Sequence, residues 1–139
     1  MKRLLIMAVL LALCTSMAWA QSGTLEGVTL TVNAKENYFP DNDIMSAKQG
    51  YRYYAVDVTL SNHSGKTISY NVMYFTLQDD KSYTYTYTPG KDPFLNCGDL
   101  ENGRSVRGWI TFEVPVASKN YTLIWKTGLI EAKQLLFRL

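Results

Sequence analysis

Few residues of this sequence have the types needed for catalysis. The single histidine, His63, stands in the turn sequence SNHSG, and Cys97 has no partner nearby in the chain. One histidine cannot supply the several ligands that zinc or copper prefers. A nucleophilic thiol needs an activating neighbour, so an enzyme would require Cys97 and His63 within hydrogen-bond reach. We therefore predict no catalytic residue, no metal site and no cofactor, and we interpret His63 as a solvated turn residue.

Two acidic runs could supply oxygen ligands to a hard cation such as calcium. They are Asp41-Asn42-Asp43 and Asp79-Asp80. Neither run has the ordered D-x-[DN]-x-[DN]-G spacing of a calcium loop. Aspartate and asparagine are also common in turns, and we predict that both runs are turns.

The feature most suggestive of binding is a strip of tyrosines in the sequence YTYTYT. Tyr83, Tyr85 and Tyr87 alternate with threonines, so one strand would place all three rings on one face. Such rings either pack across strands over the core or form an exposed strip. An exposed strip could dock a protein or stack sugars, because tyrosine combines an apolar ring with a polar tip. These three tyrosines are the candidate binding residues.

The surrounding pattern is that of short strands. Apolar residues alternate in GVTLTVNA, YRYYAVDVTLSN and SVRGWITFEV, with turn residues between the runs. TISYNV, YFTLQD, YTLIWK and AKQLLFRL add further strand-like runs. We predict an all-β fold, an immunoglobulin-like antiparallel β-sandwich of about seven to eight strands, with a closed barrel as the alternative. Residues 37–50 and 89–103 are expected to be long loops, which in compact domains are usually functional or mobile.

Gly108 stands out within one of these strands. It falls on the inward register between Val106 and Ile110. A glycine inside a strand often marks a bulge or the close approach of another backbone. Arg107 and Trp109 then lie on the outward face, where Trp109 would cover the sheet.

The N-terminus resembles a secretory signal peptide. Lys2 and Arg3 precede an apolar run at residues 4–13, which is too short to span a bilayer, and Ala18-Trp19-Ala20 is a small-x-small site. We predict cleavage after Ala20, which leaves residues 21–139 as a single domain. A lipoprotein reading uses Cys14, but the preceding Leu13 is larger than the residue a bacterial lipobox normally has there.

Charge and cysteine content limit the partners. The chain has 14 Lys+Arg and 12 Asp+Glu, and residues 1–20 hold two of the bases and none of the acids. The predicted domain therefore carries 12 of each and lacks the clustered bases of a nucleic-acid surface. It contains no further segment that could span a membrane. Cys97 is its one cysteine, so an intrachain disulfide is ruled out and a disulfide-linked dimer through Cys97 remains open.

Three runs together carry a family resemblance: YYAVDVTLSNHSGKTIS, FTLQDDKSYTY and LENGRSVRGWITFEVP. They resemble the bacterial extracellular immunoglobulin-like domains of unknown function, grouped with the telokin-like, mycobacterial immunoprotective antigen fold. The strand-end asparagine of that family is Asn62 here. Its late signature falls on Leu100, Gly103, Val106, Gly108, Phe112, Glu113, Val114 and Pro115. Asn102 and Arg104 depart from the family's usual proline and acid. The resemblance covers about residues 27–126 and implies a secreted or surface-attached sandwich without assigned catalytic residues.

These observations favour a non-catalytic module in the periplasm or outside the cell. We expect it to bind a protein partner in the cell envelope or to serve a structural role there. The alternative is carbohydrate or small-ligand binding through an exposed tyrosine strip. A sandwich is a scaffold for many functions, so the fold alone does not name the ligand.

Overall fold

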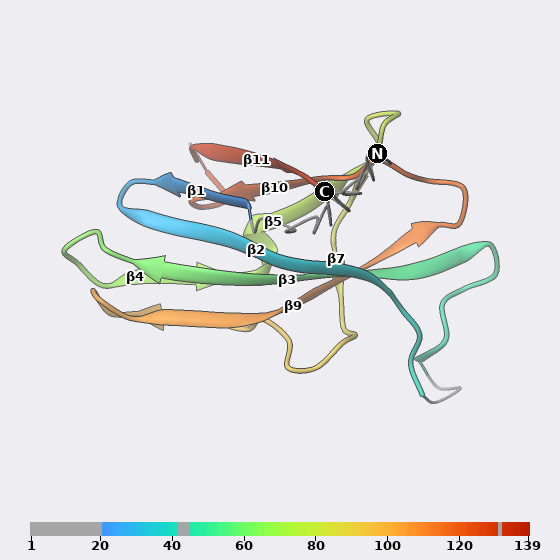
Figure 1. Ribbon diagram of the computed structural model, residues 1–139, viewed down its shortest axis with the longest axis horizontal. Coiled ribbons are helices and arrows are strands. Elements are labelled where there is room, and N and C mark those ends of the chain that lie inside the picture. The colour runs from blue at the N-terminus through green and yellow to red at the C-terminus, as the bar shows by residue number, and fades with distance from the viewer. Residues whose placement is uncertain (1–20, 42–44, 131) are drawn as a thin grey trace, which may run out of the picture.

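The computed structural model describes residues 21–41, 45–130 and 132–139. Its described residues form three antiparallel sheets (Figure 1). The largest has the order β1 (Gln21–Leu25), β2 (Val28–Tyr38), β3 (Tyr51–Asn62), β9 (Ser105–Pro115) and β7 (Tyr87–Thr88). The second has the order β11 (Gln134–Arg138), β10 (Thr122–Lys126), β5 (Phe75–Gln78) and β6 (Thr84–Tyr85). The third pairs β4 (Ile68–Asn71) with β8 (Cys97–Leu100), and a short 3-10 helix, η2 (Val72–Tyr74), leads from β4 into β5.

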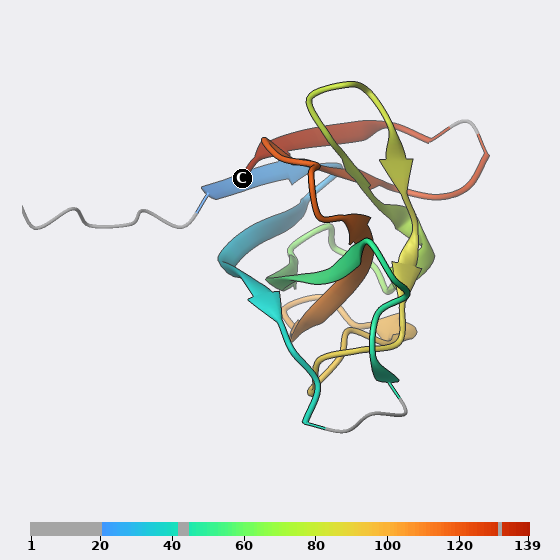
Figure 2. The ribbon, with the colours of Figure 1, turned by 90° about the vertical axis from the view of Figure 1, so that its right-hand side faces the viewer.

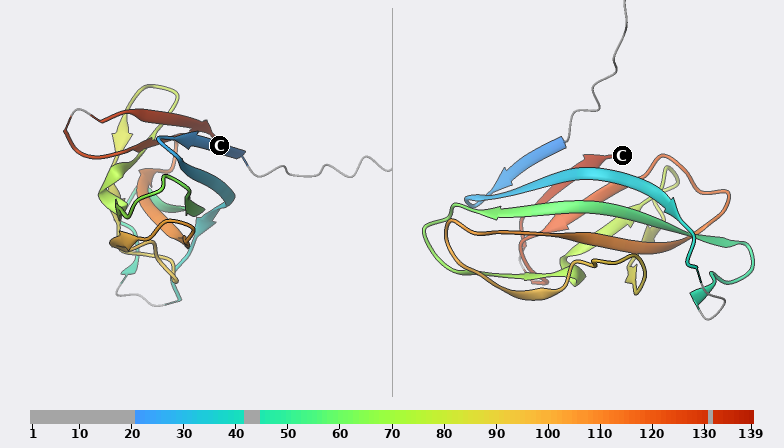
Figure 3. Two further views of the ribbon diagram at one scale, coloured as in Figure 1. Left: turned by 90° about the vertical axis from the view of Figure 1, so that its left-hand side faces the viewer. Right: turned by 60° about the horizontal axis from the view of Figure 1, so that its bottom comes forward.

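The arrangement confirms the predicted β-sandwich. The long strands β2, β3 and β9 run side by side in the right-hand view of Figure 3. An end view shows the β10–β11 hairpin across the top of the molecule with β1 beside it, and β9 lies below (Figure 2). No helix among the described residues is long and apolar enough to cross a bilayer. The signal peptide predicted for residues 1–20 lies outside the described residues, as do Asn42 and Asp43 of the first acidic run.

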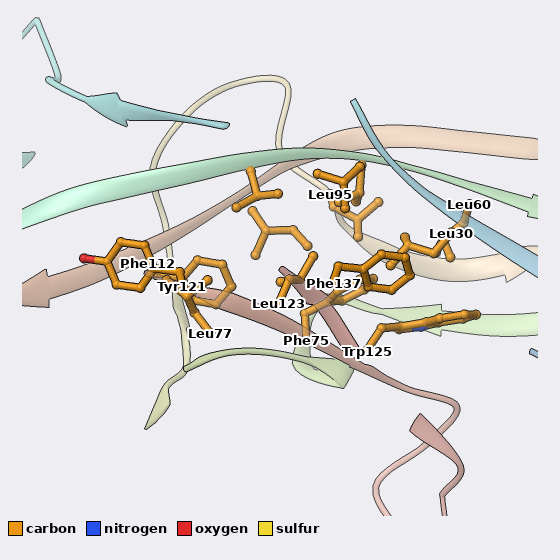
Figure 4. Close-up of a cluster of buried hydrophobic side chains, with 14 of the residues drawn as sticks. Leu30, Leu60, Phe75, Leu77, Leu95, Phe112, Tyr121, Leu123, Trp125 and Phe137 are labelled. Carbon is orange, nitrogen blue, oxygen red and sulfur yellow. The ribbon is translucent and has the colours of Figure 1, made fainter. Parts of the chain in front are cut away.

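The apolar residues that alternate along the predicted strands form the core. Inward residues of β2, β3 and β9 are buried against those of β5, β10 and β11. Figure 4 shows part of this cluster, with Leu30, Leu60 and Trp125 toward one end and Tyr121 and Phe112 toward the other. At about 25 cal/mol per Å² of apolar surface removed from water, burial of such side chains is the main favourable term in folding.

Asn62 is a buried polar residue whose side-chain hydrogen bonds connect several segments at one end of the sandwich. Its amide nitrogen donates to the carbonyl oxygens of Lys66 (2.7 Å) and Leu100 (2.8 Å). Its side-chain oxygen accepts from the backbone N–H and the hydroxyl of Ser64. One side chain thereby joins the end of β3 to the β3–β4 turn and to the β8–β9 turn, which meet at the left of Figure 1. The family's strand-end asparagine therefore has a structural role here, because every hydrogen-bonding group of a buried amide must be satisfied.

The sequence missed several short strands. The described residues contain eleven strands rather than seven to eight, because β1, β6, β7 and β8 are short or atypical. β8 falls inside the segment expected to be a long loop, and its Gly98 and Asp99 are poor strand formers. It is a strand because it pairs in register with β4, which is a long-range contact.

Candidate binding pocket

The three candidate tyrosines do not share one face of one strand, which corrects the prediction. Residues 83–88 are divided: β6, with Tyr85, pairs with β5 of the four-stranded sheet, and β7, with Tyr87, pairs with β9 of the five-stranded sheet. The chain crosses between the two sheets at Thr86, so the alternation of side chains is not that of a single strand. Tyr83 precedes β6 and is 66% exposed. The sugar-binding hypothesis needed three tyrosines exposed on one face, and this arrangement does not provide them.

Tyr85 is held toward the interior by Asp79. The Tyr85 hydroxyl donates to Asp79 Oδ2 at 2.7 Å, and the backbone N–H groups of Lys81 and Tyr83 donate to Asp79 Oδ1. Burial, followed by this hydrogen bond, raises the pKa of Tyr85 to about 12. Burial alone would raise the pKa of Asp79, but the hydrogen bonds from Tyr85, Tyr83 and Lys81 outweigh it and lower that pKa. Asp79 therefore fixes the hairpin turn between β5 and β6.

The segment after β7 runs along the edge of β9. Leu95 N–H donates to the Trp109 carbonyl oxygen at 2.8 Å, and Trp109 N–H donates to the Pro93 carbonyl oxygen at 2.8 Å. Leu95 is buried in the core, whereas Phe94 is 58% exposed. This segment is the loop drawn in yellow below β9 in Figure 1.

The lack of a side chain at Gly108 allows the backbone of residues 94 and 95 to lie directly against β9. A Cβ atom on Gly108 would lie 2.5 Å from the Leu95 nitrogen and 2.7 Å from its Cα atom. No side chain fits at those distances, so the predicted close approach of another backbone is confirmed. Trp109 lies on the outward face as expected, with Lys91 Nζ 4.0 Å from its ring centroid.

A pocket of about 370 Å³ opens where β7, the 89–96 loop and η2 meet. We call it the edge pocket. Its volume lies within the range of small-ligand sites, about 300–1,000 Å³. Its lining is mainly apolar and includes Val72, Met73, Tyr87, Pro89, Phe94 and Leu95. Met73 is 53% exposed, Phe94 58% and Tyr87 39%, so large apolar side chains surround the opening as well as the interior.

Cys97 also lines the edge pocket. Its thiol is free and the residue is exposed. His63 lies in the turn after β3, and no hydrogen bond joins it to Cys97. In the described part of the chain, no three or more His, Cys, Asp or Glu side chains come together in a way that could hold a metal ion.

Of the candidate binding residues and reactive side chains predicted from the sequence, Tyr87 and Cys97 lie at this pocket, and Trp109, predicted to cover the sheet, also lines it. Sequence reasoning missed Met73 and Phe94. Phe94 lies in a loop flagged for its length, but no sequence pattern distinguishes an exposed phenylalanine from a buried one.

The fold and the pocket define a small all-β sandwich with an apolar recess at one sheet edge. The sequence profile of the family described as Domain of unknown function (DUF4352) matches residues 20–135, and the chain belongs to this family. No curated protein matches the chain.

Solved structures share the fold at low sequence identity. The ycdA protein of Bacillus subtilis, a candidate lipoprotein, is 17% identical with a TM-score of 0.72, and the match covers 87% of this chain but 38% of that protein. The yjhA protein of Bacillus subtilis is 20% identical with a TM-score of 0.64, covering 86% of this chain and 96% of that one. MPT63, a secreted protein of Mycobacterium tuberculosis, is 13% identical with a TM-score of 0.58, covering 87% and 92%. The likeness to MPT63 and the family match confirm the resemblance drawn from the sequence.

Proposed function

We propose that this protein is a non-catalytic binding module that works outside the cytoplasm and docks a partner protein at the edge pocket. The observation that carries the proposal is the pairing of an apolar recess with exposed large side chains at its opening. Met73, Tyr87 and Phe94 are each more than one-third exposed around it. Clustered exposed apolar surface is typical of interaction sites.

The chemistry of the recess favours an apolar or aromatic side chain of the partner as its occupant. Buried aromatic anchors in pockets carry much of the affinity of protein interfaces. Nearby charges are already paired: Lys91 forms an ion pair with Glu36 and lies over the Trp109 ring. The rim therefore offers few free charges that would select a highly charged ligand.

Two observations support a location outside the cytoplasm. The signal-peptide pattern of residues 1–20 predicts export. A structure with the same fold, MPT63, is a secreted protein. We propose on this basis that the domain acts in the periplasm or outside the cell.

The test is capture of a partner from the envelope fraction with two matched variants. One carries Met73→Asp and Phe94→Asp at the edge pocket. The control carries Leu129→Asp and Leu136→Asp, which replace similarly exposed apolar residues away from it (66% and 59% exposed). The captured protein is then purified and its affinity for each variant is measured by calorimetry.

We expect the control to bind like the native protein and the pocket variant to bind at least about tenfold more weakly. Removing two buried apolar contacts costs about 1.5–3 kcal/mol each, and about 1.4 kcal/mol is tenfold in affinity. Equal affinity for the pocket variant and the control would contradict docking at this site.

A further inference from the structure

A second cleft lies at the end of the sandwich where the β1–β2 turn, β4 and the end of β10 meet. It has a volume of about 310 Å³ and is separate from the edge pocket except that Asn71 borders both. We call it the end cleft. Its existence does not depend on the proposed function, and none of the sequence-predicted site residues lines it.

One part of the wall of the end cleft is apolar because it belongs to the core. Val28, Leu60, Phe75 and Trp125 line it, and each is at most 5% exposed. Leu60 and Trp125 lie toward the same end of the buried cluster in Figure 4. An apolar chain entering here would meet the side chains that form the core.

The surroundings of the cleft carry positive charge that is not neutralised. Lys66 and Lys126 both line it, and neither forms an ion pair with any carboxylate of the described residues. The one acidic residue in the lining, Glu26, is paired with Lys133 at 3.2 Å. Tyr70 and Tyr74 also line the cleft.

We infer that the end cleft binds a single-chain anionic amphiphile, with its acyl chain among Leu60, Phe75 and Trp125 and its carboxylate between Lys66 and Lys126. The apolar part of the wall favours an amphiphile over a small hydrophilic anion, which would use only the polar part. Two unpaired lysines disfavour a cationic amphiphile of the same length. The volume is at the lower end of ligand sites, which fits one short acyl chain rather than a two-chain lipid.

The experiment titrates the purified protein with decanoate below its micelle concentration and follows the indole N–H signals by NMR. Trp125 lines the end cleft and Trp109 lines the edge pocket, so each site has its own reporter. The variants Trp109→Phe and Trp125→Phe assign these two signals, and any further indole signal belongs to Trp19 of the predicted signal peptide. We expect the Trp125 signal to shift to saturation and the Trp109 signal to stay in place.

A charge-matched pair of variants tests the headgroup site. Lys66→Gln with Lys126→Gln should weaken decanoate binding roughly 3- to 30-fold, since exposed ion pairs contribute up to about 1 kcal/mol each. The control, Lys35→Gln with Lys119→Gln, removes the same charge from exposed positions outside the cleft and should bind with native affinity.

Three results would overturn the inference. One is an unshifted Trp125 signal. Another is equal weakening by both variant pairs, which would indicate a general charge effect. The third is equal affinity for decyltrimethylammonium, which would show that the lysines do not select the ligand. Because the edge pocket has a separate reporter, failure here leaves the proposed protein-docking function untouched.

Discussion

At Asp79, a buried carboxylate organises a hairpin turn through three hydrogen bonds. The donors are the Tyr85 hydroxyl and two backbone N–H groups of the turn. A carboxylate that accepts several such bonds keeps its charged form down to lower pH. The pKa of Asp79 is accordingly below its ordinary value of 3.8, although burial opposes the shift.

The lowered pKa of Asp79 predicts how the stability of the protein changes in acid. In the unfolded chain the Asp79 carboxyl has its ordinary pKa of 3.8, and in the folded protein its pKa is lower. The charged carboxylate therefore stabilises the fold fully above pH 3.8, and this stabilisation is lost as the pH falls through the pKa of the folded state. Asp79→Asn should therefore lose less stability than the native protein between pH 5 and 2. The measurement is the melting temperature across that range. Asp80→Asn, at the exposed neighbour, should follow the native curve, and an Asp79→Asn curve parallel to the native one would contradict the assignment.

Asp57 and Arg107 form an ion pair on the outward face of the large sheet. The sequence predicts an outward Arg107, and its side chain is 67% exposed. Its guanidinium nonetheless donates to both oxygens of Asp57, which is only 4% exposed, and the hydrogen bonds raise the pKa of Arg107. Arg107 thereby satisfies a buried carboxylate on the outward face of the large sheet, which would otherwise be costly to bury.

At the scale of the elements, the 89–96 segment and β9 form one unit because Gly108 leaves room for the loop backbone. The contact positions Phe94 at the edge pocket and Leu95 in the core. A change at Gly108 should therefore affect both the stability of the domain and the shape of the pocket.

Gly108→Val should destabilise the domain by about 3 kcal/mol or prevent it from folding. Its side chain would overlap backbone atoms of residues 94 and 95, which cannot move without breaking hydrogen bonds to Trp109. Gly128→Ala is the matched control, since no atom lies within 4 Å of its added Cβ. Urea denaturation measures both variants, and a native midpoint for Gly108→Val would refute the close approach.

Across the described residues, the sandwich is stabilised by packing, and their one cysteine forms no cross-link. Cys97 is free and exposed at the edge pocket. In the presence of an oxidant that accepts two electrons, two such thiols can each lose a proton and join as a disulfide, so the disulfide-linked dimer through Cys97 stays a prediction.

Cys97→Ser should leave the melting temperature within about 3 °C of the native value, because exposed substitutions change stability by about 0.5 kcal/mol or less. Under oxidising conditions, we expect native protein to show a dimer band on a non-reducing gel and Cys97→Ser to lose it. A band that persists in Cys97→Ser would assign the cross-link to Cys14 instead.

Alternation in β2, β3 and β9 predicts the sandwich without any structure, because the pattern is local and dictates which side chains are buried. The inward position of Gly108 likewise indicates the close approach of another backbone. The remaining features depend on contacts between distant parts of the chain. The crossing at Thr86 divided the tyrosines between two sheets, and β8 formed only because β4 lies beside it. Both pockets join segments far apart in the chain, such as Met73 with Phe94 and Lys66 with Lys126. No local pattern records such neighbours, because they depend on how the strands pair across the whole fold.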